Sequence, residues 1–367
     1  MNVYVLGVGL HPPSEREQGR RLEEMAYHTS RAALDAAGVS RGQLDSLTLG
    51  ACDELDGRPI SSMLMSAPAG GYDTDEIKVT DSGASALALA YARFLSGESQ
   101  LGLVASWCKS SKTDLEAVMA LRGDPFYTRP LGIGAAVGDA LFAQCVGAEL
   151  GIGEAEVAER VSRAYARAAA NPRGLQRAVP SADAIACSSY DATPLRSGQR
   201  APLSDGAVSL VLASERFVHA NPDRRPLARI AGIGWASDSY RLDGARLRSL
   251  QAARRAWQDA LRQAGVGSAA ELEGIELDTP TGWHEAAYVR AFGIERAETL
   301  SPGGGSFAQN PVFCAGLVNA AEAVLQVAGR AGAVQRPDVR RAAAHGCHGT
   351  AQQGHVVMVF ESAGATR

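Results

Sequence analysis

The chain has 367 residues, of which 46% are hydrophobic and 21% are charged, an ordinary composition for a globular protein. Its formal net charge of −4 at pH 7 provides no basic surface for nucleic acid or for an anionic membrane, so we expect neither as a partner. No stretch approaches the ~20 apolar residues of a transmembrane helix, and residues 1–10 lack the basic and apolar regions of a signal peptide. These features predict a cytoplasmic protein.

The cysteines are scattered along the chain. They stand at positions 52, 108, 145, 187, 314 and 347, and no two have the C-x-x-C spacing typical of redox or metal motifs. In a chain of this size, isolated cysteines are expected to remain reduced thiols. We therefore expect no disulfide framework and no bound metal.

Three sequence elements occur twice, in the same order and at nearly constant spacing. Each set predicts an apolar strand ending in Gly-x-Gly, an amphipathic helix and a second strand, the pattern of parallel sheets covered by helices. Neither Gly-x-Gly pair has the third glycine of a dinucleotide fingerprint, so we do not predict nucleotide binding there. The repeated segments are 5–9 with 230–234, 33–39 with 260–266, and 44–49 with 272–277.

The first half predicts further elements in chain order. A helix is expected over Leu22–Ala37, where alanine and leucine recur at helical spacing and Gly38 can end the helix. A short strand follows at 76–79, then a helix of small residues that begins near Ser82, then an apolar strand at 101–106. This alternation continues the α/β pattern.

The second half contains counterparts of these elements. A glycine-rich loop at 303–305 leads through an Asn-Pro pair to a helix at 314–328. The chain closes with a small-residue turn at 345–349 and a strand at 356–361. We therefore expect the two halves to share one architecture.

The middle of the chain lies outside the repeat. Residues 109–199 have no repeat partner and are interpreted as an inserted loop region. An Asn-Pro-Asp sequence at 221–223 interrupts the pattern near the junction of the halves. We therefore divide the chain into an N-terminal half, 1–217, which carries the insertion, and a C-terminal half, 218–367.

Five short segments carry more information together than any one of them does alone. They are Val-Thr-Asp-Ser-Gly-Ala-Ser-Ala-Leu at 79–87, Asn-Pro at 171–172, Pro-Leu-Ser-Asp-Gly-Ala at 202–207, the glycine-rich region 303–316 and the loop 345–349. In this order they resemble motifs of the thiolase superfamily, and of sterol-carrier-type thiolases in particular. The first is similar to the nucleophile segment and the last to the C-terminal catalytic loop. The resemblance implies an α/β thiolase fold, with five α-β-α-β-α layers in two pseudo-symmetric halves, and a homodimer.

The chemistry of the family's motifs is altered. Thr80 stands where the family has its nucleophilic cysteine, and a shift of one or two residues would put Asp81 or Ser82 there. A threonine hydroxyl lacks both the low pKa and the nucleophilicity of a thiolate. The histidine of the family's Gly-His-Pro motif is also replaced, by Asn310. A reaction through an acyl-cysteine is therefore not expected.

Polar side chains remain where the resemblance places the active site. Asn310 is suited to donate a hydrogen bond to a thioester oxygen. His348 has the pKa of a general base, and Cys347 beside it is the less favoured nucleophile. A structural role stays open for Thr80 and Asp81, since either can cap the helix that follows. The side chains expected to line one cavity are Thr80, Asp81, His284, Asn310, Cys347 and His348.

Three functions remain open. The leading one is an acyl-CoA thioester hydrolase, in which Asp81, His284 or His348 directs a water molecule at the thioester. The second is a retro-aldol lyase that acts on an acyl-CoA side chain beside a small OB-fold partner protein. It ranks lower because no tyrosine occurs at 303–316 or 345–349. The third is a non-catalytic acyl-CoA-binding subunit of a condensing complex. In each case coenzyme A is part of the substrate, and no separate cofactor is expected.

Overall fold

The strands of the two halves follow the same order. In the computed structural model, which describes residues 1–57, 60–80 and 82–364, nine strands form one sheet in the order β3-β2-β4-β7-β1-β8-β11-β10-β9. Counted outward from the centre, β1-β7-β4-β2-β3 of the first half corresponds to β8-β11-β10-β9 of the second. A parallel bridge between Ile275 and Leu300 stands where β3 stands in the first half. The strands are β1 (Val3–Leu10), β2 (Ser46–Ala51), β3 (Asp75–Thr80), β4 (Leu101–Lys109), β5 (Tyr190–Ala192), β6 (Leu195–Arg196), β7 (Asp205–Ser214), β8 (Ala228–Ser237), β9 (Gly274–Glu276), β10 (Arg341–His348) and β11 (Gly354–Ser362).

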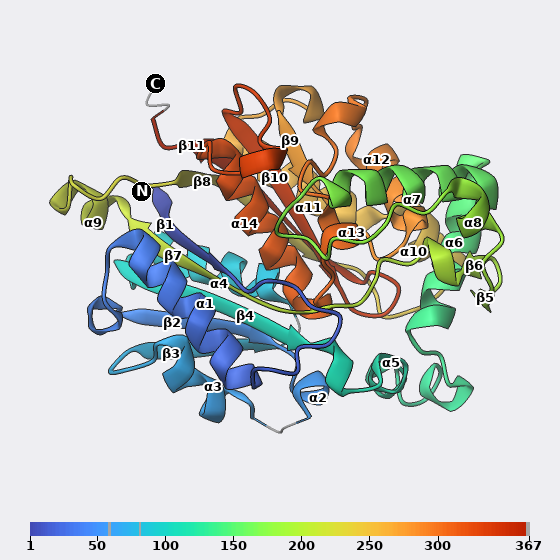
Figure 1. Cartoon of the computed structure of the whole chain (residues 1–367), viewed down its shortest axis with the longest axis horizontal. Coiled ribbons are helices and arrows are strands. Elements are labelled where there is room, and N and C mark those ends of the chain that lie inside the picture. Colours follow the sequence, from blue (N-terminus) through green and yellow to red (C-terminus); the bar gives the residue numbers. More distant parts are fainter. Residues whose placement is uncertain (58–59, 81, 365–367) are drawn as a thin grey trace.

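Helices cover the outer faces of both halves and fill the space between them (Figure 1). α1 packs on β1 and β7, α11 packs in the same way on β8 and β11, and α4 and α14 contact strands of both halves. The resulting order is helices, strands, central helices, strands and helices, which makes five layers. The helices are α1 (Leu22–Ala37), α2 (Asp53–Asp56), α3 (Ser62–Ala69), α4 (Gly83–Leu95), α5 (Leu115–Arg122), α6 (Ala135–Leu150), α7 (Glu154–Ala169), α8 (Ala182–Ala186), α9 (Glu215–Ala220), α10 (Gly244–Ser249), α11 (Gln251–Ala264), α12 (Gly282–Phe292), α13 (Gly305–Ala308) and α14 (Ala315–Val327).

The repeated Gly-x-Gly pairs allow the outer helices to approach the strands closely. A Cβ atom at Gly7 would lie 2.1 Å from the carbonyl oxygen of Ala33 in α1. A Cβ atom at Gly232 would lie 2.4 Å from the carbonyl oxygen of Ala260 in α11. Any larger residue would force the helix away from the sheet. The pairs therefore serve helix packing in both halves, which explains why they recur without a nucleotide fingerprint.

The two central helices also meet through small residues. A Cβ atom at Gly316, in α14, would lie 2.7 Å from the Cα of Gly346 in β10 and 2.9 Å from the Cβ of Ala84 in α4. Gly83 and Leu317 make a similar close contact between the helices. The small residues that predicted a helix after Ser82 are therefore the residues that let the central layer form.

The start of the chain folds as its sequence predicts. α1 has the expected bounds, Leu22–Ala37, and Gly38 adopts the left-handed conformation at φ 65° that ends a helix. The N-cap of α4 is Ser82, not Thr80 or Asp81 as expected. The hydroxyl of Ser82 accepts the main-chain N–H of Ser85, while Thr80 is still part of β3.

The expected turn at 345–349 is wrong. His345 lies inside β10, which pairs with β11 as far as His348 and Gly354. The chain reverses only between these two residues. The misprediction has a physical cause: the small residues of 345–349 suggested a turn, but Gly346 among them allows β10 to pack closely against α14.

The region 109–199 is largely helical rather than a loop. It forms α5, α6, α7 and α8 and a two-stranded ribbon of β5 and β6. α6 and α7 pack against α12 of the second half, on the right of Figure 1. Within the described residues, no single helix is long and apolar enough to cross a membrane. α6 and α7 meet that test only as a pair bent by 109°.

Candidate active site

A cavity of about 750 Å³ opens where the insertion meets the second half. β9 and β10 are parallel neighbours, so the residue positions that follow β9 and end β10 meet at one edge of the sheet. Residues of α6 and of the segment 200–203 complete the lining. The polar side chains of the lining include Asp139, Arg200, Asp278, Asn310, Cys347 and His348.

Asp278 is a buried carboxyl with a hydrogen-bond donor on each oxygen. Its Oδ2 accepts the main-chain N–H of Cys347 at 3.1 Å, and its Oδ1 accepts the hydroxyl of Ser306 at 3.1 Å. Burial raises the pKa of Asp278 to about 6, although these hydrogen bonds act in the opposite direction. The carboxyl is therefore mostly ionised at neutral pH, yet its pKa is near enough to neutrality for it to accept a proton.

Cys347 lies next to this carboxyl with its thiol protonated. The side chain is buried, and Sγ donates to the main-chain oxygen of Asp278 at 3.5 Å. Burial first, and then the negative charge of Asp278, raise the pKa of the thiol well above its usual range. Because the thiolate is the nucleophile, a thiol held in this state is a poor one.

His348, at the end of β10, is a neutral imidazole. Its Nδ1 is buried and makes no hydrogen bond within the described part of the chain. Burial, followed by the positive charge of Arg122, lowers the pKa of His348 to about 4. The ring is therefore uncharged at neutral pH, but it is a weaker base than the carboxylate of Asp278.

Asn310 is held in the lining through its main chain. Its N–H donates to the hydroxyl of Ser204 at 2.9 Å, and its carbonyl oxygen accepts the N–H of Ser204 at 3.1 Å. Ser204 belongs to the Pro-Leu-Ser-Asp-Gly-Ala segment, so that segment positions the residue that faces the cavity. The side-chain amide of Asn310 remains as a donor for a substrate oxygen.

His284 lies behind the cavity wall and does not line it, which corrects the expected direct role. Its ring is fully buried, with Nδ1 2.8 Å from the hydroxyl oxygen of Thr281. Its Nε2 lies 3.8 Å from Oδ1 of Asp139, which does line the cavity. Burial lowers the pKa of His284 to about 3, so the ring is neutral. His284 can therefore affect the site indirectly, and Asp139 is a lining residue that it contacts.

Asp139 and Arg200 are lining residues that the sequence interpretation missed. Burial raises the pKa of Asp139 to about 7, although the guanidinium of Arg200, 4.0 Å away, favours the carboxylate. A signal for Asp139 was present in the sequence, since it is the only charged residue at positions 135–148. An isolated carboxyl in a helix of small and apolar residues indicates a special environment.

Comparison with known proteins identifies the architecture. No family model and no curated protein matches the sequence. Among solved structures, the Ltp2-ChsH2(DUF35) aldolase matches with a TM-score of 0.81 and 17% identity, over 100% of this chain and 99% of that chain. Human mitochondrial 3-ketoacyl-CoA thiolase matches with a TM-score of 0.78 and 16% identity, over 98% of this chain and 99% of that chain. The chain has the thiolase fold.

This thiolase fold brings together the expected site residues of the second half but not Thr80. Thr80 ends β3, is exposed and is not among the residues that line the cavity. The reason is that β3 is the outermost strand of the sheet, bonded only to β2 on its inner side. Asp81 lies outside the described residues. Among the described site residues, Asn310, Cys347 and His348 share the cavity, while Thr80 and His284 do not line it.

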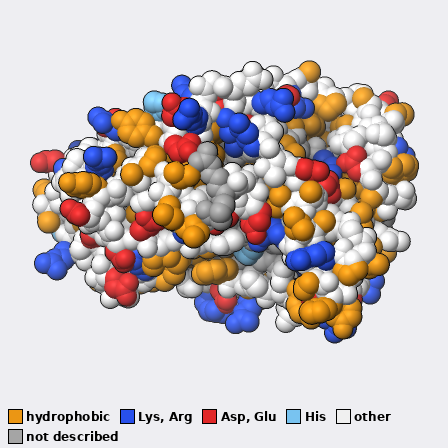
Figure 2. All heavy atoms as spheres, turned by 90° about the horizontal axis from the view of Figure 1, so that it is seen from below, with side chains coloured by type: hydrophobic (Ala, Val, Ile, Leu, Met, Phe, Trp, Pro, Cys, Tyr) orange, Lys and Arg blue, Asp and Glu red, His pale blue; other side chains and the backbone are white. Residues whose placement is uncertain are grey.

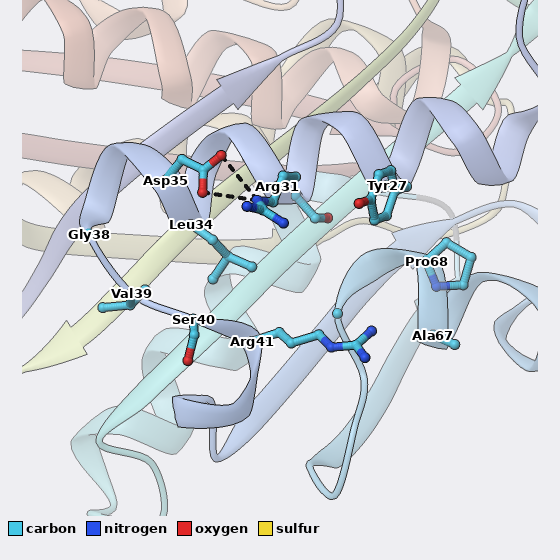
Figure 3. Close-up of a pocket in the computed structure, with 12 residues that line it drawn as sticks. Tyr27, Arg31, Leu34, Asp35, Gly38, Val39, Ser40, Arg41, Ala67 and Pro68 are labelled. Carbon is cyan, nitrogen blue, oxygen red and sulfur yellow. Dashed lines mark hydrogen bonds and ion pairs between the residues drawn. The ribbon is translucent and has the colours of Figure 1, made fainter.

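A second cavity in the thiolase fold, of about 650 Å³, lies between α1 and α3 (Figure 3). Tyr27 and Arg31 line one side and Arg41 the other. Its carboxyl, Asp35, is paired with Arg31 at 3.0 Å, and its described lining includes no histidine and no cysteine. It therefore lacks a histidine base and a cysteine nucleophile, and its carboxyl is already paired, so we place the chemistry in the first cavity.

Possible cofactor ligands are few. Among the described residues, no group of three or more His, Cys, Asp or Glu side chains could hold a metal ion. All six cysteines are described, and none forms a disulfide. Arg177 and Arg200 line the first cavity and are the cations there that suit phosphate groups.

Proposed function

We propose that the chain cleaves an acyl-CoA by acid–base chemistry, without an acyl-cysteine. The observation that carries this proposal is the pair formed by Asp278, a carboxyl with a pKa of about 6, and Cys347, a thiol that burial keeps protonated. The carboxylate accepts the proton that the reaction releases. The amide of Asn310 donates to the thioester oxygen as negative charge develops on it.

Thioester hydrolysis is the first candidate reaction. Asp278 takes a proton from a water molecule while the water oxygen bonds to the thioester carbon, and Asn310 stabilises the resulting oxyanion. The carbon–sulfur bond then breaks, and the sulfur takes up a proton as coenzyme A leaves. This reaction needs only water as co-reactant, and it uses groups that the single chain already contains.

Retro-aldol cleavage is the second candidate, and Tyr165 is the observation that favours it. The argument against a lyase was the absence of tyrosine from two loops, but Tyr165 of α7 lines the cavity. Asp278 would take the proton of a β-hydroxyl group, the bond between Cα and Cβ would break, and the thioester enolate would rest on Asn310. Protonation of Cα completes a shortened acyl-CoA. The fold likeness to a solved aldolase also supports this candidate.

One experiment in D2O separates the candidates. The purified chain is incubated with a panel of acyl-CoAs and 3-hydroxyacyl-CoAs, and the products are analysed by mass spectrometry. Hydrolysis releases coenzyme A and a free acid, with no deuterium on carbon. Retro-aldol cleavage releases a carbonyl compound and a shortened acyl-CoA that carries deuterium at Cα. If neither product forms, even with a small OB-fold partner protein present, acyl-CoA cleavage is refuted and a non-catalytic acyl-CoA-binding subunit is favoured.

The proposal also includes a homodimer and a cytoplasmic location. β3 is an edge strand, and neighbouring α3 and its flanks expose large hydrophobic side chains, including Ile60, Met63 and Tyr72. Figure 2 shows hydrophobic side chains on the face seen from below, interspersed with charged ones. An exposed strand edge beside apolar side chains is a surface that a second copy can cover. The cytoplasmic location rests on the reduced cysteines expected from the sequence.

A further inference from the structure

A histidine and an aspartate face each other across the wall of the first cavity. Nε2 of His284 lies 3.8 Å from Oδ1 of Asp139, slightly beyond a hydrogen bond. The imidazole is fully buried, and Nε2 has no hydrogen-bond partner among the described residues. Asp139 lines the cavity while His284 does not. The carboxyl therefore separates the imidazole from whatever occupies the cavity.

The surrounding structure holds this imidazole in one orientation. Its ring stacks on Phe142 with centroids 4.3 Å apart and planes 7° from parallel. Phe142 lies one helical turn after Asp139 on α6, so both residues share one face of that helix. The hydroxyl of Thr281 contacts Nδ1 at 2.8 Å from the other side. With Nδ1 at Thr281, the other ring nitrogen, Nε2, is directed at the carboxyl of Asp139.

We infer that Asp139 and His284 form a proton-sharing pair, in which Asp139 is the proton donor of the site and His284 is a positioning residue. The pair holds one proton between Oδ1 and Nε2, and Nδ1–H donates to Thr281. A closure of roughly 1 Å would make the hydrogen bond. During turnover the O–H bond of Asp139 breaks, and the proton forms the S–H bond of coenzyme A or the Cα–H bond of a shortened acyl-CoA. Solvent then returns a proton to the carboxylate.

The surroundings of the pair bring the pKa of Asp139 close to neutral pH, so that its carboxyl can release a proton there. Burial raises the pKa of Asp139, and the negative charge of Glu116 raises it further. The positive charge of Arg200 and a hydrogen bond from the side chain of Gln352 lower it. The balance places the pKa of Asp139 at about 7. The other titratable groups near the pair include Tyr288, His345, Cys347 and His355.

The pair can be tested without a substrate, by infrared titration of the carboxyl C=O band in the intact protein. We expect a band that titrates near pH 7 and disappears in Asp139→Asn. His284→Asn keeps a polar atom near Thr281 but does not reach Asp139, and we expect it to move the titration by roughly one pH unit. His284→Gln places a polar atom close to the position of Nε2, and the shift should be smaller. The matched control is Asp191→Asn, which removes a partner of Arg200 at 3.2 Å without altering the described lining of the cavity.

The titration tests this inference separately from the proposed function. The inference rests on the proposed function only for the group that receives the proton. Circular dichroism first shows which variants fold. If folded His284→Asn leaves the titration unchanged, or if the Asp139 band titrates near the ordinary aspartate pKa of 3.8, the pair is refuted even in an active protein. If the titration behaves as expected but no acyl-CoA is cleaved, the proposed function fails while the pair stands. In an active protein, cleavage should decline above pH 7 as Asp139 loses its proton, and Asp139→Asn should lower the rate roughly 10²-fold or more and abolish that decline.

Discussion

The main-chain N–H of Cys347 donates a hydrogen bond to Oδ2 of Asp278 across 3.1 Å. This bond joins the end of β10 to the residue position that follows β9, and it holds a carboxyl in the cavity wall. The same burial raises the pKa of both side chains, to about 6 for the acid and well above the usual range for the thiol. At neutral pH the acid can therefore accept a proton while the thiol keeps its own. In the proposed mechanism, Asp278 and not Cys347 therefore serves as the base.

Replacing the base should remove most of the activity. We expect Asp278→Asn to lower kcat/KM by roughly 10²–10⁴-fold, the usual contribution of a positioned general base. Asparagine keeps the size of the side chain and can still accept the hydroxyl of Ser306. The control is Asp259→Asn on α11, in an outer layer. Equal activity in the two folded variants would remove Asp278 from the mechanism.

Removing the cavity thiol should have little effect. We expect Cys347→Ala to keep at least about a tenth of the wild-type turnover, because a protonated thiol forms no acyl-enzyme. Cys314→Ala is a matched control, since Cys314 is also buried, has a pKa raised to about 12 by burial and does not line the cavity. Mass spectrometry of quenched reactions provides the direct measurement. An acyl group trapped on Cys347, or an inactive Cys347→Ala beside an active Cys314→Ala, would contradict the mechanism.

The acid side of the pH profile should identify the base. Asp278 works as its carboxylate, so we expect kcat/KM to fall as the pH drops through about 6, the raised pKa of this group. His348 has a pKa of about 4 and would give a decline near that value instead. His348→Gln should therefore leave the decline near pH 6 in place. A decline near pH 4 that His348→Gln abolishes would assign the base to His348.

Asp139 should cost stability at high pH. Its pKa is about 7 in the folded chain against 3.8 for an unburied aspartate, a difference worth roughly 4 kcal/mol at about 1.4 kcal/mol per pH unit. Because the folded pKa is raised, the stability contribution is fully present below pH 3.8 and is lost as the pH rises through about 7. We therefore expect Asp139→Asn to raise Tm at pH 9 relative to wild type. Thermal unfolding at pH 4 is the reference, where the difference should nearly vanish.

The oligomeric state should follow from the edge strand. We expect sedimentation to give a dimer at micromolar concentration, because β3 has an unpaired edge beside exposed side chains such as Met63, which is 80% exposed. A charge at that position should weaken association, so Met63→Glu should shift the equilibrium toward monomer. Met63→Gln, which is similar in size but uncharged, should do so less. A wild-type chain that remains monomeric under these conditions would refute the homodimer.

Much of the fold could be predicted from the sequence, because its signals are local. The repeated strand–helix–strand units became β1-α1-β2 and β8-α11-β9. The spacing of alanine and leucine in 22–37 and the glycine that follows set the bounds of α1. The turn at 345–349 was mispredicted, since small residues are common both in turns and under a closely packed helix. Only the contact of Gly346 with α14 distinguishes these two cases.

The candidate site was only partly predictable. Asn310, Cys347 and His348 line the cavity because the motifs of the second half converge there. Thr80 does not, because it ends the outermost strand of the sheet and is exposed. Asp139 was missed because it lies on the insertion, which has no repeat partner to suggest where it packs.

The sequence by itself determined the repeated strand–helix–strand order of the two halves and the absence of a cysteine from 79–87. These properties are carried by spacing along the chain, which folding does not change. Only the tertiary structure decided which side chains have shifted pKa values. The pKa values of Asp278, Asp139 and Cys347 depend on how completely several elements exclude water from each side chain. Burial of that kind is a property of the packed assembly, because residues far apart in sequence create it together.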